Sequence, residues 1–117
     1  MIGVDLVENE KIKKLLNKEK FVERVYTKNE IEYLEKFKDK LEHYAGFFAC
    51  KEAVMKALEE CKQIGFKDIE ICHKENGSPY VVLSGKAKEI FEAGGYKKIE
   101  VSISQTKNFA TAVAYCE

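Results

Sequence analysis

The 117-residue sequence predicts an α+β fold in which helices cover one face of a mostly antiparallel sheet. Apolar and polar residues alternate near both ends of the chain, which is typical of strands. An alanine-rich stretch with helical periodicity lies between them, and Asn76-Gly77 marks a tight hairpin. This order of strand, helices, hairpin, helix and hairpin favours the α+β class. The length fits a single domain over residues 1–117.

The first half is predicted to be one strand followed by helices. Residues 2–7 alternate as a strand does, and the following residues change to a helical period with lysines on the outer face. Residues 21–26 fit neither pattern. Thr27 and Glu30 form a capping box that begins another helix. Residues 40–62 give the longest helical pattern, in which alanine favours helix.

The second half is predicted to be mostly strands. Asparagine and glycine both tolerate a positive φ, so Asn76-Gly77 suits the turn between two paired strands. Later glycines end a helix. Strands are expected at 66–73, 80–83, 99–103 and 110–115, and a helix at 84–93 that stops before Gly94-Gly95.

Charge and hydropathy exclude several classes of function. Lys and Arg total 20 and Asp and Glu total 20, so the chain lacks the basic field of a general nucleic-acid binder. No apolar run approaches the roughly 20 residues that a membrane span needs. The first residues are strand-like and show no signal-peptide pattern, so the cytoplasm is the expected compartment.

The cysteines do not form a metal-binding pattern. Their spacings are wide, and His43 and His73 are not at ligand spacing from any of them. A zinc site or two disulfides are possible readings, but cysteine also serves as a small buried apolar residue, and this reading is favoured. The cysteines are Cys50, Cys61, Cys72 and Cys116.

Three charged residues stand in apolar surroundings. Asp5 lies inside an apolar strand, where it could cap the following helix, sit at a sheet edge or bind a cation. Glu52 and Lys56 are four residues apart on the alanine-rich helix, which also fits a simple surface ion pair. If both carboxylates converge beside the lysine, the group suits Mg²⁺ and phosphate.

A basic segment follows the first strand. It is either a solvated helix face or a docking surface for an acidic partner, because segregated positive charge speeds association with such a partner. Its members are Lys11, Lys13, Lys14, Lys18, Lys20 and Arg24.

Five segments in chain order together resemble one family, the holo-acyl-carrier-protein synthase type of 4'-phosphopantetheinyl transferase. The likeness runs from residue 2 to residue 116 at nearly fixed spacing, which makes it far more specific than any one motif. The segments are IGVDLVE at 2–8, FVERVYT at 21–27 followed by Glu30, AGFFACKEA at 45–53 with Lys56-Ala57, DIEI at 68–71 with NGSPY at 76–80, and VSIS at 101–104.

The resemblance implies a magnesium-dependent transfer of phosphopantetheine from coenzyme A to a serine of an acyl carrier protein, with release of 3',5'-ADP. Asp5 and Glu52 match the magnesium ligands, and Glu52 or a metal-bound water would take the serine proton. Lys56 matches the residue that contacts the phosphates. The catalytic set is therefore Asp5, Glu52 and Lys56, and the coenzyme A set is Lys56, Gly77, Pro79, Ser104 and Gln105.

The resemblance also implies partners. Short family members are typically homotrimers with active sites between subunits, so Asp5 and Glu52 would come from one subunit and part of the nucleotide pocket from another. Lys11, Lys14 and Arg24 would face the acidic carrier protein.

Three departures from the family pattern affect the donor end. Phe47 stands in place of an arginine, Gln105 in place of a histidine, and residues 58–65 lack the family's Gly-Thr-Gly. Each lost charge-assisted bond to phosphate is worth on the order of 1.5–3 kcal/mol, so we expect weaker or altered donor binding. A divergent, non-catalytic binder of carrier protein or coenzyme A is the alternative. A regulatory or nucleic-acid module is disfavoured by the neutral charge and the lack of paired surface aromatics on the strands.

Overall fold

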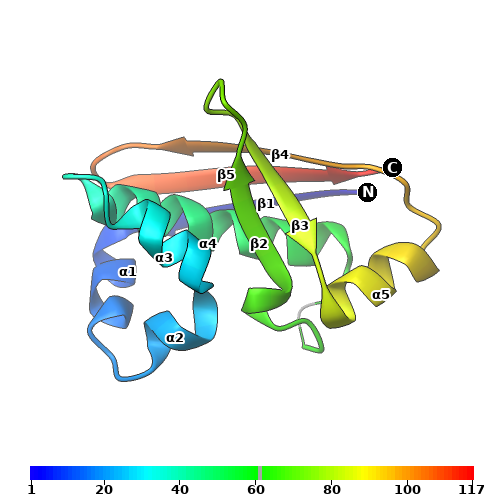
Figure 1. Ribbon diagram of the computed structural model, residues 1–117, viewed down its shortest axis with the longest axis horizontal. Helices are drawn as coiled ribbons and strands as arrows, with labels where there is room; N and C mark the ends of the chain where they lie inside the picture. Colours follow the sequence, from blue (N-terminus) through cyan, green and yellow to red (C-terminus); the bar gives the residue numbers. More distant parts are fainter. Residues whose placement is uncertain (61) are drawn as a thin grey trace.

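Two antiparallel sheets and one long helix organise the computed structural model of the chain, which describes residues 1–60 and 62–117 (Figure 1). The predicted α+β class and antiparallel pairing are confirmed, although the strands divide between a three-stranded and a two-stranded sheet. The strand orders are β1-β5-β4 and β2-β3. The elements are β1 (Ile2–Glu8), α1 (Asn9–Leu16), α2 (Phe21–Val25), α3 (Lys28–Leu34), α4 (Lys40–Ala57), η1 (Phe66–Asp68), β2 (Ile69–His73), β3 (Pro79–Leu83), α5 (Gly85–Ala93), β4 (Ile99–Gln105) and β5 (Phe109–Cys116).

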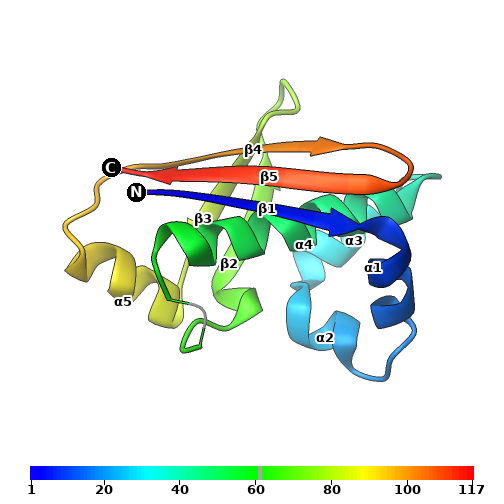
Figure 2. The ribbon, with the colours of Figure 1, turned by 180° about the vertical axis from the view of Figure 1, so that it is seen from behind.

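Helix α4 packs along one face of the three-stranded sheet, as both views show (Figure 1, Figure 2). Small residues line both surfaces of this contact and let the helix approach closely. At the nearest point, Gly3 of β1 faces the α4 backbone, and a Cβ there would overlap the carbonyl oxygen of Ala53. The buried small residues include Ala49, Ala53 and Ala57 of α4 and Ala110, Ala112 and Ala114 of β5.

Three boundaries differ from the sequence prediction. The ambiguous stretch forms α2, because Phe21 and Val25 are buried in the core. Helix α4 ends at Ala57 rather than residue 62, because Glu59 adopts a left-handed φ of 58° that stops the helix. The predicted strand at 66–73 begins with the η1 turn instead, where the Asp68 side chain accepts a bond from the Gly65 amide.

The predicted capping box and hairpin are both confirmed. The Thr27 hydroxyl accepts a bond from the Glu30 amide, and the Glu30 carboxylate accepts one from the Thr27 amide. Gly77 takes a φ of 90° in the loop between β2 and β3. The start of α3 and the turn between β2 and β3 therefore follow from short sequence motifs.

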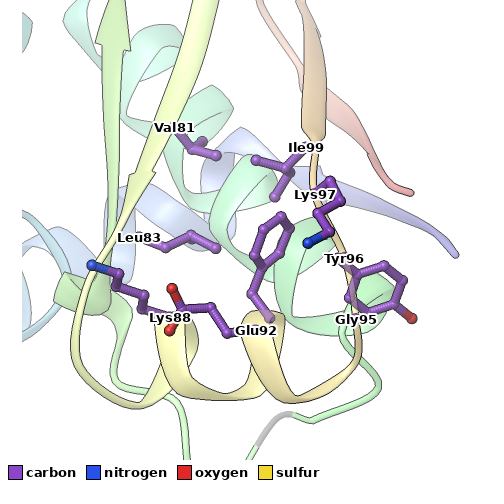
Figure 3. Close-up of a pocket in the computed structure, with 9 residues that line it drawn as sticks. Val81, Leu83, Lys88, Glu92, Gly95, Tyr96, Lys97 and Ile99 are labelled. Atoms are coloured by element: carbon purple, nitrogen blue, oxygen red, sulfur yellow. The ribbon is translucent and has the colours of Figure 1, made fainter.

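Strands β3 and β4 lie alongside each other without a hydrogen-bonded ladder between them in the part of the chain that is described. Figure 3 shows Val81 and Leu83 of β3 facing Ile99 of β4 across this boundary. These side chains are only half-buried, whereas Ile69 and Ile71 of neighbouring β2 are 0 % and 4 % exposed. We call this incompletely filled boundary the β3–β4 seam; its inward-facing residues are Pro79, Val81, Leu83, Ile99, Val101, Ile103 and Gln105.

The cysteines within the described residues behave as predicted for free thiols. Cys50 and Cys116 are buried in the core, Cys72 is half-buried, and all three are unpaired; Cys61 lies outside the described residues. Burial raises the pKa of the Cys50 thiol to about 12. Among the described helices, none combines the length and apolar character needed to cross a membrane.

The close approach at Gly3 generates a stability prediction. Gly3→Ala should lower the free energy of unfolding by about 1–3 kcal/mol, because the new methyl group forces β1 away from α4. Urea denaturation monitored by circular dichroism measures this. Gly65→Ala is the control, since its Cβ would meet only ordinary contacts; an equal effect of the two substitutions would contradict the tight packing at Gly3.

Candidate active site

Asp5 and Lys56 form an ion pair between β1 and α4. The Lys56 Nζ donates to Asp5 Oδ1 at 3.0 Å and to the Val4 carbonyl oxygen at 3.1 Å. The Asp5 side chain is 13 % exposed and the Lys56 side chain 48 %. Asp5 does not cap the following helix, whose N-cap is Glu8. The exposed Lys56 ammonium is thus held beside the largely buried Asp5 carboxylate, at the edge of the contact between α4 and β1.

Glu52 lies one turn before Lys56 on the same side of α4. Its carboxyl is half-buried, and burial, followed by the nearby charge of Asp5, raises its pKa above the ordinary value. The two carboxylates are therefore close enough to repel each other. The structure therefore brings Asp5, Glu52 and Lys56 together. The sequence alone had left open whether these three residues converge.

The carboxylate pair fits a divalent cation. Asp5 Oδ2 is buried and has no hydrogen-bond partner, so it is an acceptor that lacks a positive group. The described residues contain no cluster of three or more metal-binding side chains. A cation here would have two protein carboxylates and would complete its coordination with water and phosphate oxygens, which is the usual arrangement for Mg²⁺.

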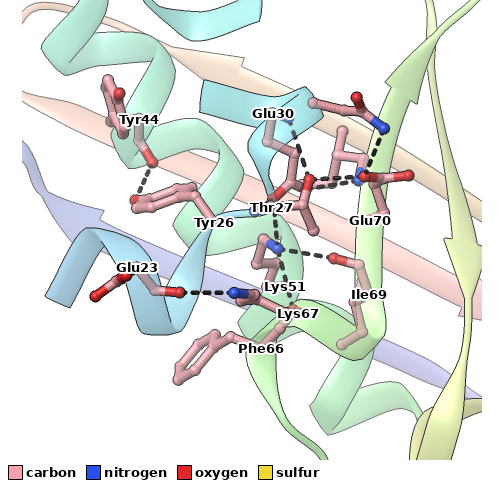
Figure 4. Close-up of polar contacts among 12 residues, drawn as sticks. Glu23, Tyr26, Thr27, Glu30, Tyr44, Lys51, Phe66, Lys67, Ile69 and Glu70 are labelled. Atoms are coloured by element: carbon pink, nitrogen blue, oxygen red, sulfur yellow. Dashed lines mark hydrogen bonds and ion pairs between the residues drawn. The ribbon is translucent and has the colours of Figure 1, made fainter. Parts of the chain in front are cut away.

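A buried polar network fixes α4 from its other side (Figure 4). Lys51 is fully buried and pairs with Glu30 Oε1 of α3 at 2.8 Å. Its Nζ also donates to the carbonyl oxygens of Phe66 and Ile69 at 3.0 and 2.8 Å. Glu30 Oε2 accepts the Ile71 amide of β2 at 2.7 Å. The network joins α3, α4 and β2 at Lys51, the residue that precedes Glu52 in α4.

An aromatic cavity of about 310 Å³ opens at one end of the β3–β4 seam. The ring centroids of Tyr33 and His73 are 4.4 Å apart and nearly parallel, and Phe47 lies 5.7 Å from His73. The Gln105 side-chain nitrogen is 2.8 Å from His43 Nδ1. The cavity is lined by Tyr33, Phe37, His43, Phe47, His73, Gly77, Pro79, Ile103 and Gln105.

Three of the five residues predicted to contact coenzyme A line this cavity, namely Gly77, Pro79 and Gln105. Ser104 is exposed on the opposite face of β4, and Lys56 lies beside Asp5 on β1. A single chain therefore does not bring all five together.

The sequence analysis missed five residues of the cavity, namely Tyr33, Phe37, His43, His73 and Ile103. A signal for three of them was present, because Tyr33 and Phe37 are four residues apart, as are His43 and Phe47, and this spacing places residues on one side of a helix. His73 ends β2 and Ile103 lies in β4, so tertiary packing brings these two to the cavity.

Helix geometry places the carboxylates and the aromatic cavity on opposite sides of α4. Nine residues separate His43 from Glu52, which is a rotation of about 180° at 3.6 residues per turn. The same offset separates Phe47 from Lys56. His43 and Phe47 lie on the side of Gln105 in β4, whereas Glu52 and Lys56 lie on the side of Asp5 in β1. Strand β5 runs between β1 and β4.

The predicted docking residues lie on the exposed sides of α1 and α2. Lys11, Lys14 and Arg24 are all exposed, and Lys11 approaches Glu8 at 3.9 Å. Lys11 also borders an apolar cavity of about 280 Å³ between β1 and α1. The other residues lining this cavity are Leu6, Val7, Glu8, Ile12, Leu15, Phe48 and Phe109.

The part of the sheet face formed by β1 and β5 on the side away from α4 is mostly apolar and exposed. Its apolar side chains alternate with the buried ones along both strands, and their exposed fractions run from 39 % to 67 %. An exposed apolar patch of this kind is typical of an interaction surface. Its members are Ile2, Val4, Leu6, Phe109, Val113 and Tyr115.

Comparison with known proteins gives consistent matches over the whole chain. Residues 1–114 match the model of the 4'-phosphopantetheinyl transferase superfamily. The chain is 47 % identical over 115 residues to the holo-[acyl-carrier-protein] synthase of Thermoanaerobacter sp. (strain X514), covering 97 % of this chain and 83 % of that one. The enzyme of the same name from Caldicellulosiruptor saccharolyticus is 43 % identical, with 99 % and 94 % covered.

Solved structures agree with these sequence matches. The Helicobacter pylori holo-[acyl-carrier-protein] synthase in complex with coenzyme A superposes with a TM-score of 0.84 at 35 % identity, over 100 % of both chains. The Bacillus anthracis enzyme in complex with CoA (3',5'-ADP) gives a TM-score of 0.81 at 34 % identity, over 98 % of this chain and 93 % of that one.

The raised pKa of Glu52 leads to a prediction about stability without divalent cations. Because the folded-state pKa of this carboxyl is raised, the folded state loses stability as pH rises from the ordinary carboxyl value through the raised pKa, and the effect is absent below the ordinary value. Glu52→Gln should therefore raise the unfolding midpoint by about 2–4 °C near pH ~8, but not near pH ~4. Calorimetry in EDTA measures this difference.

The exposed Glu59→Gln serves as the control and should leave the midpoint unchanged at both pH values. Added Mg²⁺ should stabilise the wild type more than Glu52→Gln, because a ligand stabilises the form that binds it. A midpoint for Glu52→Gln that is lower than wild type near neutral pH would contradict the proposed repulsion.

Proposed function

The chain belongs to the 4'-phosphopantetheinyl transferase superfamily, and we propose that it transfers phosphopantetheine from coenzyme A to a serine of an apo acyl carrier protein. The observation that carries this proposal is the convergence of Asp5, Glu52 and Lys56 between β1 and α4. Relatives named holo-[acyl-carrier-protein] synthase support the reaction, and two of the similar structures contain coenzyme A. We further propose that residues 1–117 act as one domain in the cytoplasm, where coenzyme A is available.

We propose Asp5 and Glu52 as the ligands of a magnesium ion. The unpartnered Oδ2 of Asp5 supports this assignment, as does the repulsion that raises the pKa of Glu52. When bound, Mg²⁺ supplies positive charge against the pyrophosphate oxygens of the donor.

In the proposed reaction, the serine Oγ forms a bond to the β-phosphorus of coenzyme A, and the bond from that phosphorus to the oxygen of 3',5'-ADP breaks. Glu52 accepts the serine proton. Lys56 stabilises the negative charge on the leaving oxygen, because its ammonium is held at the site by Asp5 and the Val4 carbonyl.

We propose the aromatic cavity as the site for the nucleotide end of coenzyme A. Phe47 supplies no cation and is itself buried, nearly parallel to Tyr33 with ring centroids 5.9 Å apart. The half-buried rings of Tyr33 and His73 offer stacking surface to a purine. Gln105 offers an amide for hydrogen bonding. Donor binding would thus depend more on ring contacts and less on charge than in the family pattern.

We propose that a complete site is shared between subunits of a homotrimer. The carboxylates and the aromatic cavity face opposite sides of α4, so one copy can give its carboxylates and a neighbour its cavity to the same donor. The exposed apolar sheet face supports self-association, because it is a surface that a second copy can cover. In this arrangement the exposed Ser104 would meet the donor from the neighbouring copy.

We propose that Lys11, Lys14 and Arg24 dock the acidic carrier protein. All three are exposed, and Lys11 and Lys14 are three residues apart on one side of α1, while Arg24 lies on α2. The apolar cavity beside Lys11 begins next to Asp5 on β1, so it offers an apolar contact between the docking surface and the carboxylates.

A non-catalytic binder remains the alternative function. The observation that favours it is Phe47, which packs against His73 and Tyr33 where the family pattern has an arginine. Retention of carrier-protein binding without any transfer would establish this alternative.

The proposed transfer can be tested by intact-mass spectrometry. An apo carrier protein incubated with the chain, coenzyme A and Mg²⁺ should gain one phosphopantetheine. EDTA or Asp5→Ala should abolish the gain, and Lys56→Met should slow it by about 10²-fold or more, because it removes a positive charge from the leaving group. Lys62→Met, an exposed lysine beyond the end of α4, should match wild type; no mass gain with any carrier protein would refute the proposal.

The docking surface can be tested by charge reversal. Lys11→Glu/Lys14→Glu should raise the KM for the carrier protein about tenfold at low salt, with less effect at high salt, because charge steers the encounter. Lys86→Glu/Lys88→Glu on α5 changes the net charge equally and should leave KM unchanged. Equal effects of the two double variants would show that net charge, not this surface, matters.

The shared site can be tested by mixing subunits. Lys56→Met damages the carboxylate side, and His73→Glu places negative charge in the aromatic cavity. If one donor uses both sides from different subunits, an equal mixture of the two inactive variants reassembled together should regain about a quarter of wild-type activity. If each site lies within one chain, mixing restores nothing.

A further inference from the structure

A second cavity, of about 540 Å³, lies at the other end of the β3–β4 seam, under α5. Ile99, at the start of β4, lines this cavity. Gln105, at the end of the same strand, lines the aromatic cavity. The two ends are about 20 Å apart at the usual rise of a strand. The cavity is lined by Val81, Leu83, Lys88, Phe91, Glu92, Gly95, Tyr96, Lys97 and Ile99.

The cavity exists because three elements diverge there. Strands β3 and β4 share no ladder in the described chain, and α5 crosses beneath them without closing the space (Figure 3). The aliphatic side chains of Val81, Leu83 and Ile99 consequently remain half-exposed although they face inward. About half of its wall is apolar, and a space of this size is within the range of small-molecule sites.

The walls combine aliphatic and aromatic surface. Phe91 and Tyr96 close one side, with ring centroids 5.7 Å apart. The backbone amides of Lys97 and Lys98 both donate to the Glu117 carbonyl oxygen, at 2.7 and 2.9 Å, which fixes the segment that carries Tyr96 and Lys97. The apolar surface is therefore held open by backbone bonds rather than by side chains that could collapse into it.

One positive charge is directed into this space. Figure 3 shows the Lys97 amine pointing between Ile99 and α5, whereas the Lys88 amine points outward, with the Glu92 carboxylate near the Lys88 stem. Lys98, the next residue, is instead paired with Glu100 at 2.8 Å. The cavity thus has an exposed ammonium group at its edge and an aliphatic wall formed by Val81, Leu83 and Ile99, which suits a molecule with an anionic head and an aliphatic tail.

We propose that this cavity binds a medium-chain aliphatic monocarboxylate. Its carboxylate meets the Lys97 ammonium, and its tail lies against Val81, Leu83, Ile99 and Phe91. The ligand is distinct from the proposed donor and acceptor, because the site is at the opposite end of the seam from the aromatic cavity. The proposal does not rest on transferase activity.

The test is a titration of the ¹⁵N-labelled full chain with hexanoate, octanoate and decanoate, followed by amide shifts in NMR. The amides of Leu83, Tyr96 and Ile99 should move, and affinity should rise about fourfold with each added methylene, as burial of a CH₂ predicts. Decanol should bind at least about tenfold more weakly than decanoate, because it lacks the charge that pairs with Lys97.

Two lysine variants separate this site from general attraction to a charged surface. Lys97→Met should weaken decanoate binding about tenfold or more, and the neighbouring Lys98→Met should leave it unchanged. Both lysines are exposed, so neither variant endangers the fold. Val81→Phe, which fills the cavity, should abolish binding while the protein's unfolding midpoint stays close to wild type.

Several outcomes would overturn the proposal. Shifts confined to the aromatic cavity around His43, equal effects of the two lysine variants, or an affinity independent of chain length would each do so. An absence of shifts up to millimolar decanoate, as when a second copy of the chain covers the cavity, would also overturn it.

Discussion

The placement of the active-site helix depends on the buried ion pair between Lys51 and Glu30. All three hydrogens of the Lys51 ammonium are used, by Glu30 and by the carbonyls of Phe66 and Ile69. Glu30 in turn accepts the amides of Thr27 and Ile71. Removing either partner would leave an uncompensated buried charge, which costs about 3–5 kcal/mol. Because α3, α4 and β2 meet at this pair, it sets the rotation of α4 and so the direction of the next residue, Glu52.

With its rotation fixed, α4 divides the molecule into two half-sites. Its alanines lie against the three-stranded sheet and Lys51 is used in the buried ion pair, so the two flanks of the helix carry the candidate site residues. One flank gives Glu52 and Lys56 to Asp5 of β1, and the other gives His43 and Phe47 to the seam beside β4. One helix therefore carries the residues of both candidate half-sites, on opposite sides. The proposed homotrimer would bring a carboxylate side and a cavity side from different copies to the same donor.

The features that the sequence predicted well are those with a local cause. The Thr27 capping box, the Asn76-Gly77 hairpin and the polar Asp5 in an apolar strand each follow from a few neighbouring residues. Helix α2 could not be predicted in this way, because burial of Phe21 and Val25 against distant aromatic residues decides it. Nor could the choice of Asp5 over Glu52 as the partner of Lys56, since it depends on how closely β1 approaches α4. The aromatic cavity arises from tertiary packing at the seam, which the sequence does not reveal. The sequence shows only that its rings occur in two pairs spaced four residues apart.

The two half-sites differ in how much change their surroundings tolerate. Asp5 and Lys56 are held by the contact between β1 and α4, where even one added methyl group at Gly3 would collide with backbone. Phe47, by contrast, is buried beside a seam whose other walls are only half-buried, so its surroundings are less closely packed than those of Asp5. The departures from the family pattern at Phe47 and Gln105 lie at this seam, whereas Asp5 and Lys56 lie at the close contact between β1 and α4. A substitution at the proposed donor cavity therefore disturbs the packing less than one at the proposed carboxylate site.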